Sequence, residues 1–224
     1  MPRLQKFPAT IGLFALALVL LFAACRSTPG SGDTRFRVNL GTEPPSLDWS
    51  LATDHVSFNV IANLMVGLTE FDKNLKPAPV IANSWDVLDG GKRIVFHLRD
   101  DVLWSDGKKV RAQDFEYSWK RLLNPKTASQ YAYILFDIAN AQDYAEGKLK
   151  DAAAVGVQAQ DDQTLMVTLR HPASYFLAIT TFEVTYPQRE DIVDKFANRW
   201  TEPANIVTNG PFLLSSCISL GEQS

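Results

Sequence analysis

The stretch from Ser84 to Thr127, SWDVLDGGKRIVFHLRDDVLWSDGKKVRAQDFEYSWKRLLNPKT, contains two tight turns followed by one helical pattern. The first turn, 89–91 (DGG), separates SWDVL from KRIVFHLR. In the second of these segments Ile94, Phe96 and Leu98 alternate with polar or less apolar residues. Alternation on both sides of a glycine-rich turn predicts a β-hairpin, and Asp106-Gly107 predicts a second tight turn between apolar flanks.

The segment AQDFEYSWKRLL that follows changes to a helical period. Phe115, Trp119 and Leu122 fall on one stripe, and the pattern stops before Pro125. A proline disfavours helical geometry in the residue before it, so we expect the helix to end there.

The rest of the chain alternates between the same two kinds of pattern. We expect a half-buried strand at 35–40, with Phe36, Val38 and Leu40 on one face, and an amphipathic helix after an N-cap at Asp54. Further patterns predict helices over 130–149 and 190–200 and a second hairpin around Asp161-Asp162. Frequent hairpins mixed with helices predict an α/β fold with mixed α+β sheets.

The first 34 residues differ in composition from the rest. Arg3 and Lys6 precede an apolar run at 11–24, which is shorter than the roughly 20 residues that span a bilayer, so it favours an export signal. An uncleaved membrane anchor is the alternative. The stretch 21–25 (LFAAC) resembles a bacterial lipobox, which predicts a lipoprotein signal peptide at 1–25 and lipidation of Cys25. Residues 26–34 have the Ser, Pro and Gly content of a flexible tether.

Composition excludes several classes of protein. The chain is 46% hydrophobic and 21% charged, which is typical of a globular protein, and its formal charge of −3 offers no broad basic face for nucleic acid. With Cys25 lipidated, Cys217 has no partner for an intrachain disulfide.

Catalytic and metal-binding patterns are absent from the sequence. His55, His97 and His171 are far apart, no cysteine lies near them, and the G-x-S-x-G motif does not occur. We interpret His97 as a residue on the face of a sheet, and the acid pairs at 100–101 and 161–162 as solvated turn residues. We therefore expect neither an enzyme nor a cofactor.

Three segments together resemble extracellular solute-binding proteins of family 5: TEPPSLDW (42–49), the long run 63–127, and NIVTNGPF (205–212). Residues 128–169 are more similar to the oligopeptide-binding branch. The resemblance implies the substrate-binding component of an ABC importer, an exported and membrane-anchored lipoprotein at the cell envelope. Such a protein closes two lobes around a short peptide and delivers it to permease subunits in the membrane. Backbone pairing would supply affinity without reading the peptide sequence.

The resemblance also divides the chain. Residues 35–212 would be the N-terminal part of the solute-binding domain, a partial periplasmic-binding-protein-like lobe with an inserted smaller subdomain at about 66–190. The main sheet would use 35–65 and 191–212. Residues 213–224 resemble nothing in the family, so we expect an aberrant tail, a missing second lobe and impaired binding. The alternative function is a shortened surface lipoprotein with a structural or interaction role and no peptide binding.

Site residues carry over at three positions. Thr53 and His55 fall where the family's cleft-lining segment contacts the ligand, and Tyr131 matches a tyrosine that packs beside the peptide. A solvated loop before a helix is the alternative for Thr53 and His55, and an aromatic on a buried helix face is the alternative for Tyr131.

Overall fold

The computed structural model describes residues 35 and 37–216 of the chain. Its contacts divide the chain into two units, Met1–Asn39 and Leu40–Ser224. The described residues of the first unit, Arg35 and 37–39, lie in no helix or strand. Every helix, strand and buried hydrophobic side chain of the described part belongs to the second unit, which therefore carries its own core.

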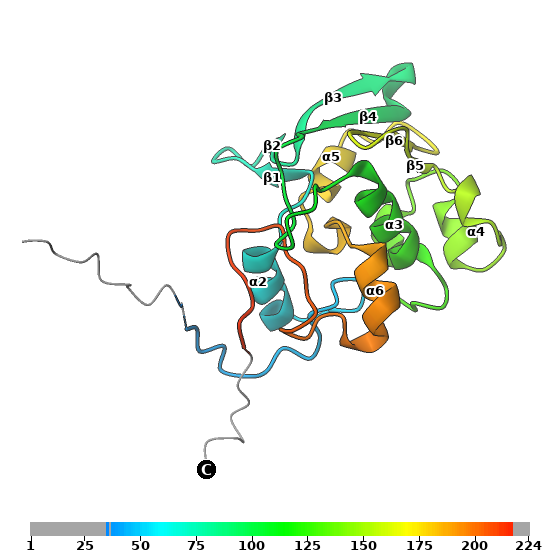
Figure 1. Cartoon of the computed structure of the whole chain (residues 1–224). Coiled ribbons are helices and arrows are strands. Elements are labelled where there is room, and N and C mark those ends of the chain that lie inside the picture. Colours follow the sequence, from blue (N-terminus) through cyan, green and yellow to red (C-terminus); the bar gives the residue numbers. More distant parts are fainter. Residues whose placement is uncertain (1–34, 36, 217–224) are drawn as a thin grey trace, which may run out of the picture. The chain divides into compact units, whose positions relative to one another are not determined.

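Four antiparallel strands form the larger sheet of the second unit, in the order β3-β4-β6-β5 (Figure 1). They are β3 (Ala82–Leu88), β4 (Arg93–Leu98), β6 (Thr164–Thr168) and β5 (Val157–Ala159). Both predicted hairpins are confirmed, because β3 pairs with β4 across Asp89–Gly91 and β5 pairs with β6. A smaller sheet pairs β1 (Thr69–Phe71) with β2 (Pro77–Pro79).

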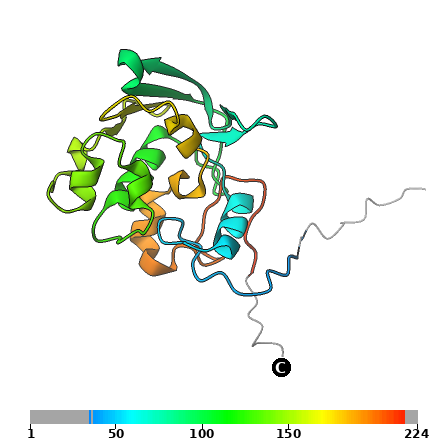
Figure 2. The ribbon, with the colours of Figure 1, turned by 180° about the vertical axis from the view of Figure 1, so that it is seen from behind.

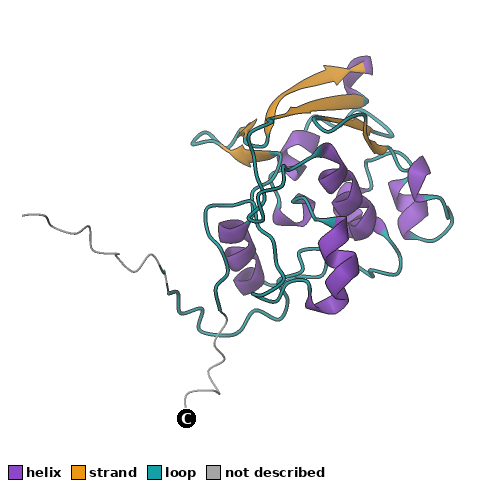
Figure 3. Cartoon of the chain, in the orientation of Figure 1, coloured by secondary structure: helices purple, strands orange, loops and turns teal. Residues whose placement is uncertain are grey.

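One face of the larger sheet is buried against α3 (Ala112–Leu123), which packs on β5 and β6. Ile94, Phe96 and Leu165 are at most 3% exposed, whereas the alternating residues of β4 and β6 are only half buried. A strand with one buried face requires this period of two, which the sequence shows. Figures 2 and 3 show the larger sheet at one edge of the unit, with helices beside it.

The remaining helices are short. They are α2 (His55–Leu64), α4 (Ala141–Ala145), α5 (Phe176–Ile179) and α6 (Glu190–Phe196), with single 3-10 turns at Ala152–Ala154, Glu183–Thr185 and Ala197–Arg199. The predicted N-cap of α2 is confirmed, because the Asp54 carboxylate accepts a 2.8 Å hydrogen bond from the Ser57 backbone N–H. α3 also ends as predicted, at Leu123 before Pro125.

The prediction of one helix over 130–149 is wrong. The segment forms a 3-10 turn, Ala132–Leu135, and then α4. Between the two, Ile138 pairs with Leu169 in an isolated bridge, and Asn140 adopts left-handed geometry with φ of 63°. On either side of Ile138, the Ala139 N–H donates to the Thr168 carbonyl and the Arg170 N–H donates to the Asp137 carbonyl. These backbone groups are therefore not available to a continuous helix, and the tertiary contact divides the segment.

Two other predicted elements differ from the structure. The helix predicted over 190–200 ends at Phe196, because Ala197 has φ of 49° and ψ of −126°, outside helical geometry. No strand occurs in the described residues of 35–40, and Val38 is 60% exposed; Phe36 lies outside the described part.

The main sheet expected from 35–65 and 191–212 does not form either, because all strands of the described part lie between residues 69 and 168. The segment around Asn209 is instead joined to the segment around Val66 by side-chain hydrogen bonds and not by the backbone pairing of two strands. The Asn209 side chain accepts from the Val66 N–H at 3.0 Å and donates to the Val66 carbonyl at 3.1 Å. The adjacent Gly210 N–H donates to the Leu64 carbonyl at 2.9 Å. A Cβ at Gly210 would lie 2.6 Å from the Leu64 carbonyl carbon, so glycine is required here.

The SLDW element is a buried junction of several segments. The Asp48 carboxylate accepts two hydrogen bonds from the Arg121 guanidinium, at 2.8 and 2.6 Å, and one from the Trp200 indole at 3.1 Å. It also accepts from the Ser50 N–H, while the Gln188 side chain connects Ser50 with Arg121. A buried charge is tolerated only when it is paired in this way.

Candidate ligand-binding site

Thr53 and His55 lie at the N-terminal end of α2 and are both exposed. The carboxylate of Asp54, between them, turns back to cap the helix through the N–H and hydroxyl of Ser57. Within the described part, no hydrogen bond engages the backbone N–H or C=O of Thr53. This stretch of main chain is therefore open to pairing with an extended ligand.

Tyr131 lies in the segment before the 3-10 turn Ala132–Leu135 and is half buried. Its ring lies 5.8 Å from that of Phe58 and 5.6 Å from that of Phe182 (centroid to centroid), both edge-on, while Phe58 and Phe182 are 5.4 Å apart. We call these three residues the aromatic cluster. Such edge-to-face packing adds stability beyond area burial.

The aromatic cluster links Tyr131 to α2. Phe58 is on α2, so the cluster connects Tyr131 with the helix whose first turn carries Thr53 and His55. Tyr133, 6.2 Å from Tyr131, extends the cluster to the surface with 60% of its area exposed. Tyr131 is thus both a packing residue and the neighbour of an exposed aromatic surface.

Glu183, which sequence reasoning missed, follows Phe182 and is half buried. Burial raises the pKa of its carboxyl group, whereas its own backbone N–H and the charge of His55 lower that pKa. Glu183 in turn contributes to the raised pKa of Tyr186, for which burial is the larger cause. An isolated carboxylate in the apolar run TTFEVTYP was the available sequence signal.

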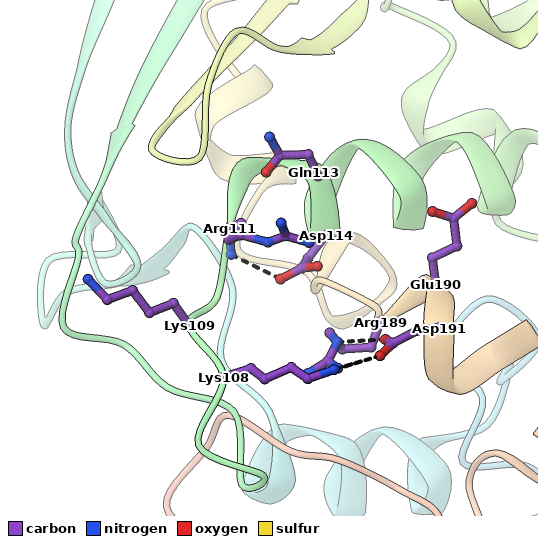
Figure 4. Close-up of a pocket in the computed structure, with 8 residues that line it drawn as sticks. All are labelled: Lys108, Lys109, Arg111, Gln113, Asp114, Arg189, Glu190 and Asp191. Carbon is purple, nitrogen blue, oxygen red and sulfur yellow. Dashed lines mark hydrogen bonds and ion pairs between the residues drawn. The ribbon is translucent and has the colours of Figure 1, made fainter. Parts of the chain in front are cut away.

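A polar cavity of about 520 Å³ lies elsewhere, between the loop 104–110 and the N-terminal ends of α3 and α6 (Figure 4). The Arg189 side chain, which is 6% exposed, pairs with Asp106 at 3.1 Å and Asp191 at 2.7 Å. Arg189 and Lys108 hold the pKa of Asp191 well below its usual range. Most of the cavity's charges are thus neutralised within the protein.

Next to this cavity, Trp104 of the WSDG turn is hydrogen-bonded to Asp114 of α3. The Trp104 indole donates to the Asp114 carboxylate at 3.0 Å. The Arg111 N–H donates to the same carboxylate at 2.9 Å (Figure 4). Burial raises the pKa of Asp114, and these hydrogen bonds oppose the rise. None of Thr53, His55 and Tyr131 lines this cavity. The cavity lies where the loop that contains the WSDG turn meets α3 and α6.

The other predicted polar residues are in place as turn or surface groups. His97 lies in the middle of β4, half buried on the open face of the sheet, 2.8 Å from the Asp86 carboxylate. Asp161 accepts from the Gln163 N–H, which is a turn contact. Over residues 35 and 37–216, no group of three or more His, Cys, Asp or Glu side chains could hold a metal ion. In the same residues no helix is long and apolar enough to cross a membrane. Cys25, the signal at 1–25, the tether at 26–34 and residues 217–224 lie outside the described part.

Known proteins resemble this chain over most of its length. The oligopeptide-binding protein OppA of Escherichia coli is 43% identical over 182 residues, covering 80% of this chain and 33% of OppA. The probable deoxycholate-binding periplasmic protein YgiS of the same organism is 36% identical over 194 residues, covering 86% of this chain and 36% of YgiS. Haemophilus influenzae OppA, solved with the peptide RPPGFSPFR, superposes with a TM-score of 0.76 at 37% identity, covering 81% of this chain and 36% of that one.

The chain thus spans about a third of the length of the relatives it matches. The model of the bacterial extracellular solute-binding proteins, family 5 Middle, matches residues 76–222. This range includes most of the 213–224 stretch that sequence reasoning placed outside the family. The mixed α/β fold and the sequence match agree, and the chain belongs to the bacterial extracellular solute-binding proteins of family 5.

Proposed function

We propose that this chain is the substrate-binding component of a peptide ABC importer and captures short oligopeptides outside the membrane. The observation that carries the proposal is the main chain of Thr53, which no described residue engages, just before the helix α2 whose Phe58 packs with Tyr131 and Phe182. Relatives named for oligopeptide and dipeptide binding support the ligand class.

In this proposal the peptide lies extended along residues 53–55. The backbone N–H and C=O of Thr53 pair with the peptide main chain as an added strand would, and His55 contributes chiefly through its backbone. Main-chain pairing of this kind gives affinity that does not depend on sequence. Tyr131 and the exposed Tyr133 provide an apolar surface for a ligand side chain.

The partners and location in the proposal follow from the sequence. Lipid on Cys25 anchors the protein at the cell envelope, in the periplasm or on the outer face of the cytoplasmic membrane. ABC permease subunits receive the peptide there. The proposed function is binding and delivery, without catalysis and without a cofactor.

The experiment that tests peptide capture is an NMR titration of residues 40–224, the unit that carries its own core. We expect weak binding, with a free energy of about −4 kcal/mol and a Kd near millimolar. Trialanine should shift the amide signals of Thr53, His55 and Tyr131 with one common Kd.

Saturating shifts at these three amides would support peptide capture. No shift at millimolar trialanine, or shifts confined to other residues, would contradict it. That result would favour the other function, a surface lipoprotein with a structural or interaction role.

A further inference from the structure

Glu183 is a half-buried carboxylate. It begins the 3-10 turn Glu183–Thr185, between Phe182 of the aromatic cluster and two buried residues, Val184 and Thr185. This turn and α2 are in contact. Glu183 therefore lies close to α2, because its own turn packs on that helix and the preceding residue, Phe182, contacts Phe58 of the same helix.

No lysine or arginine of the described part forms an ion pair with Glu183. The charged group that acts on the Glu183 carboxyl is the imidazole of His55, and the hydrogen-bonding group is the backbone N–H of Glu183 itself. Other half-buried or buried carboxylates here have firmer partners. Asp48 pairs with Arg121, and Glu116 pairs with Lys120.

An anion that has lost part of its water without gaining a cation is costly, and folded proteins usually avoid it. Such groups gather where a ligand completes the arrangement. The rings of Phe182 and Tyr131 add two features that favour a cationic ligand side chain. Their faces attract positive charge, and their apolar surface suits the methylene stem of a lysine or arginine.

We propose that Glu183 is a specificity-determining residue that receives the positively charged side chain of a lysine or arginine in the bound peptide. The inference rests on the proposed peptide capture and adds a ligand preference to it. His55 and Thr53 hold the peptide backbone, the aromatic cluster contacts the stem of the side chain, and Glu183 pairs with its charge.

The test compares peptides that differ only in charge. Residues 40–224 are titrated with trialanine, with its three single-lysine variants, and with the same three peptides carrying Nε-acetyllysine, which keeps the stem and removes the charge. At one position of the peptide we expect lysine to bind about tenfold more tightly than acetyllysine, in line with one desolvated ion pair. Glu183→Gln should abolish this preference.

A matched variant and a blocked peptide complete the design. Glu190→Gln removes the same charge from an exposed residue at the polar cavity, and its lysine preference should equal that of the wild type. Amino-terminally acetylated peptides separate the side chain from the terminal ammonium group. If the effect of Glu183→Gln disappears with that block, Glu183 pairs with the terminus and the proposal is overturned.

The remaining outcomes are equally distinct. Trialanine binding with no lysine preference in the wild type, or a preference that survives Glu183→Gln, overturns the role of Glu183 and leaves peptide capture intact. If no peptide shifts the site amides, peptide capture fails and the role of Glu183 fails with it. Dispersed amide spectra for both variants show that each remains folded.

Discussion

Replacing Asp48 by asparagine should cause one of the largest losses of stability available to a single substitution in this protein. The Asp48 carboxylate accepts from Arg121 twice, from the Trp200 indole and from the Ser50 N–H, and its side chain is 9% exposed. The amide of the new side chain would keep the volume of the carboxylate but lose its charge. Its NH₂ group would then face either the Arg121 guanidinium or the indole N–H.

The size of the loss follows from this geometry. Arg121 is 17% exposed on its side chain, so removing its partner leaves a largely buried cation uncompensated, which costs about 3–5 kcal/mol. For a domain of this size, each kcal/mol lowers Tm by about 2–4 °C. We therefore expect Asp48→Asn to lower the free energy of unfolding by about 3 kcal/mol or more and Tm by about 6 °C or more.

The assay is urea unfolding of residues 40–224, followed by tryptophan fluorescence and circular dichroism. Asp194→Asn is the matched control, because the Asp194 side chain is exposed on α6 and makes no hydrogen bond or ion pair among the described residues; it should change stability by less than about 0.5 kcal/mol. A double variant, Asp48→Leu with Arg121→Met, should lose less than the sum of its single changes. A loss below about 1 kcal/mol for Asp48→Asn would refute the view that this junction is a buried, mutually dependent network.

Four further predictions concern other parts of the chain. Gly210→Ala should destabilise the unit by about 2–4 kcal/mol in urea unfolding, because the new Cβ would meet the Leu64 carbonyl carbon at 2.6 Å; an unchanged midpoint would contradict the close approach. Leu75→Gly should stabilise it by about 1 kcal/mol, since Leu75 is 78% exposed at φ of 58°, a geometry that glycine adopts without strain, and a loss of stability would contradict this. Burial raises the pKa of Tyr117 from 10.0 to about 12, so the folded state holds this proton more firmly. The stability that the protonated Tyr117 contributes is complete below pH 10.0 and is lost as the pH rises through about 12. In urea unfolding at a series of alkaline pH values, Tyr117→Phe should therefore lose less free energy of unfolding than the wild type. Labelled palmitate should appear on the expressed full chain and be absent from Cys25→Ser, and equal labelling of both would refute lipidation at this residue.

Local sequence was enough to predict the elements whose cause is local. The hairpins depend on turn residues and on alternation within a few positions, as in the β3–β4 pair around Asp89–Gly91. The N-cap of α2 needs only the Asp54 carboxylate and an N–H three residues later. The ordered motifs of 63–127 were likewise sufficient for the family, which the comparisons confirm.

Elements that depend on distant partners could not be predicted in this way. The helical period of 130–149 was real, but the pairing of Ile138 with Leu169 overrode it. The strand expected at 35–40 showed the correct alternation, yet the described residues of that range have no strand beside them. A period of two allows a strand and does not supply the neighbour whose hydrogen bonds it needs.

The candidate site also has a part that the sequence indicated and a part that depends on the folded structure. Thr53, His55 and Tyr131 came from the family resemblance, whereas the link between Tyr131 and α2 depends on Phe58 and Phe182, whose rings meet only after folding. Asp48 and Trp200 are 152 residues apart, and nothing in the sequence near either one indicates the other. The sequence by itself determined the hairpins, the caps and the family, because these depend on neighbours along the chain. Tertiary structure alone decided which buried charges are paired and that no lysine or arginine of the described residues pairs with Glu183, since burial and pairing are properties of residues brought together from distant parts of the chain.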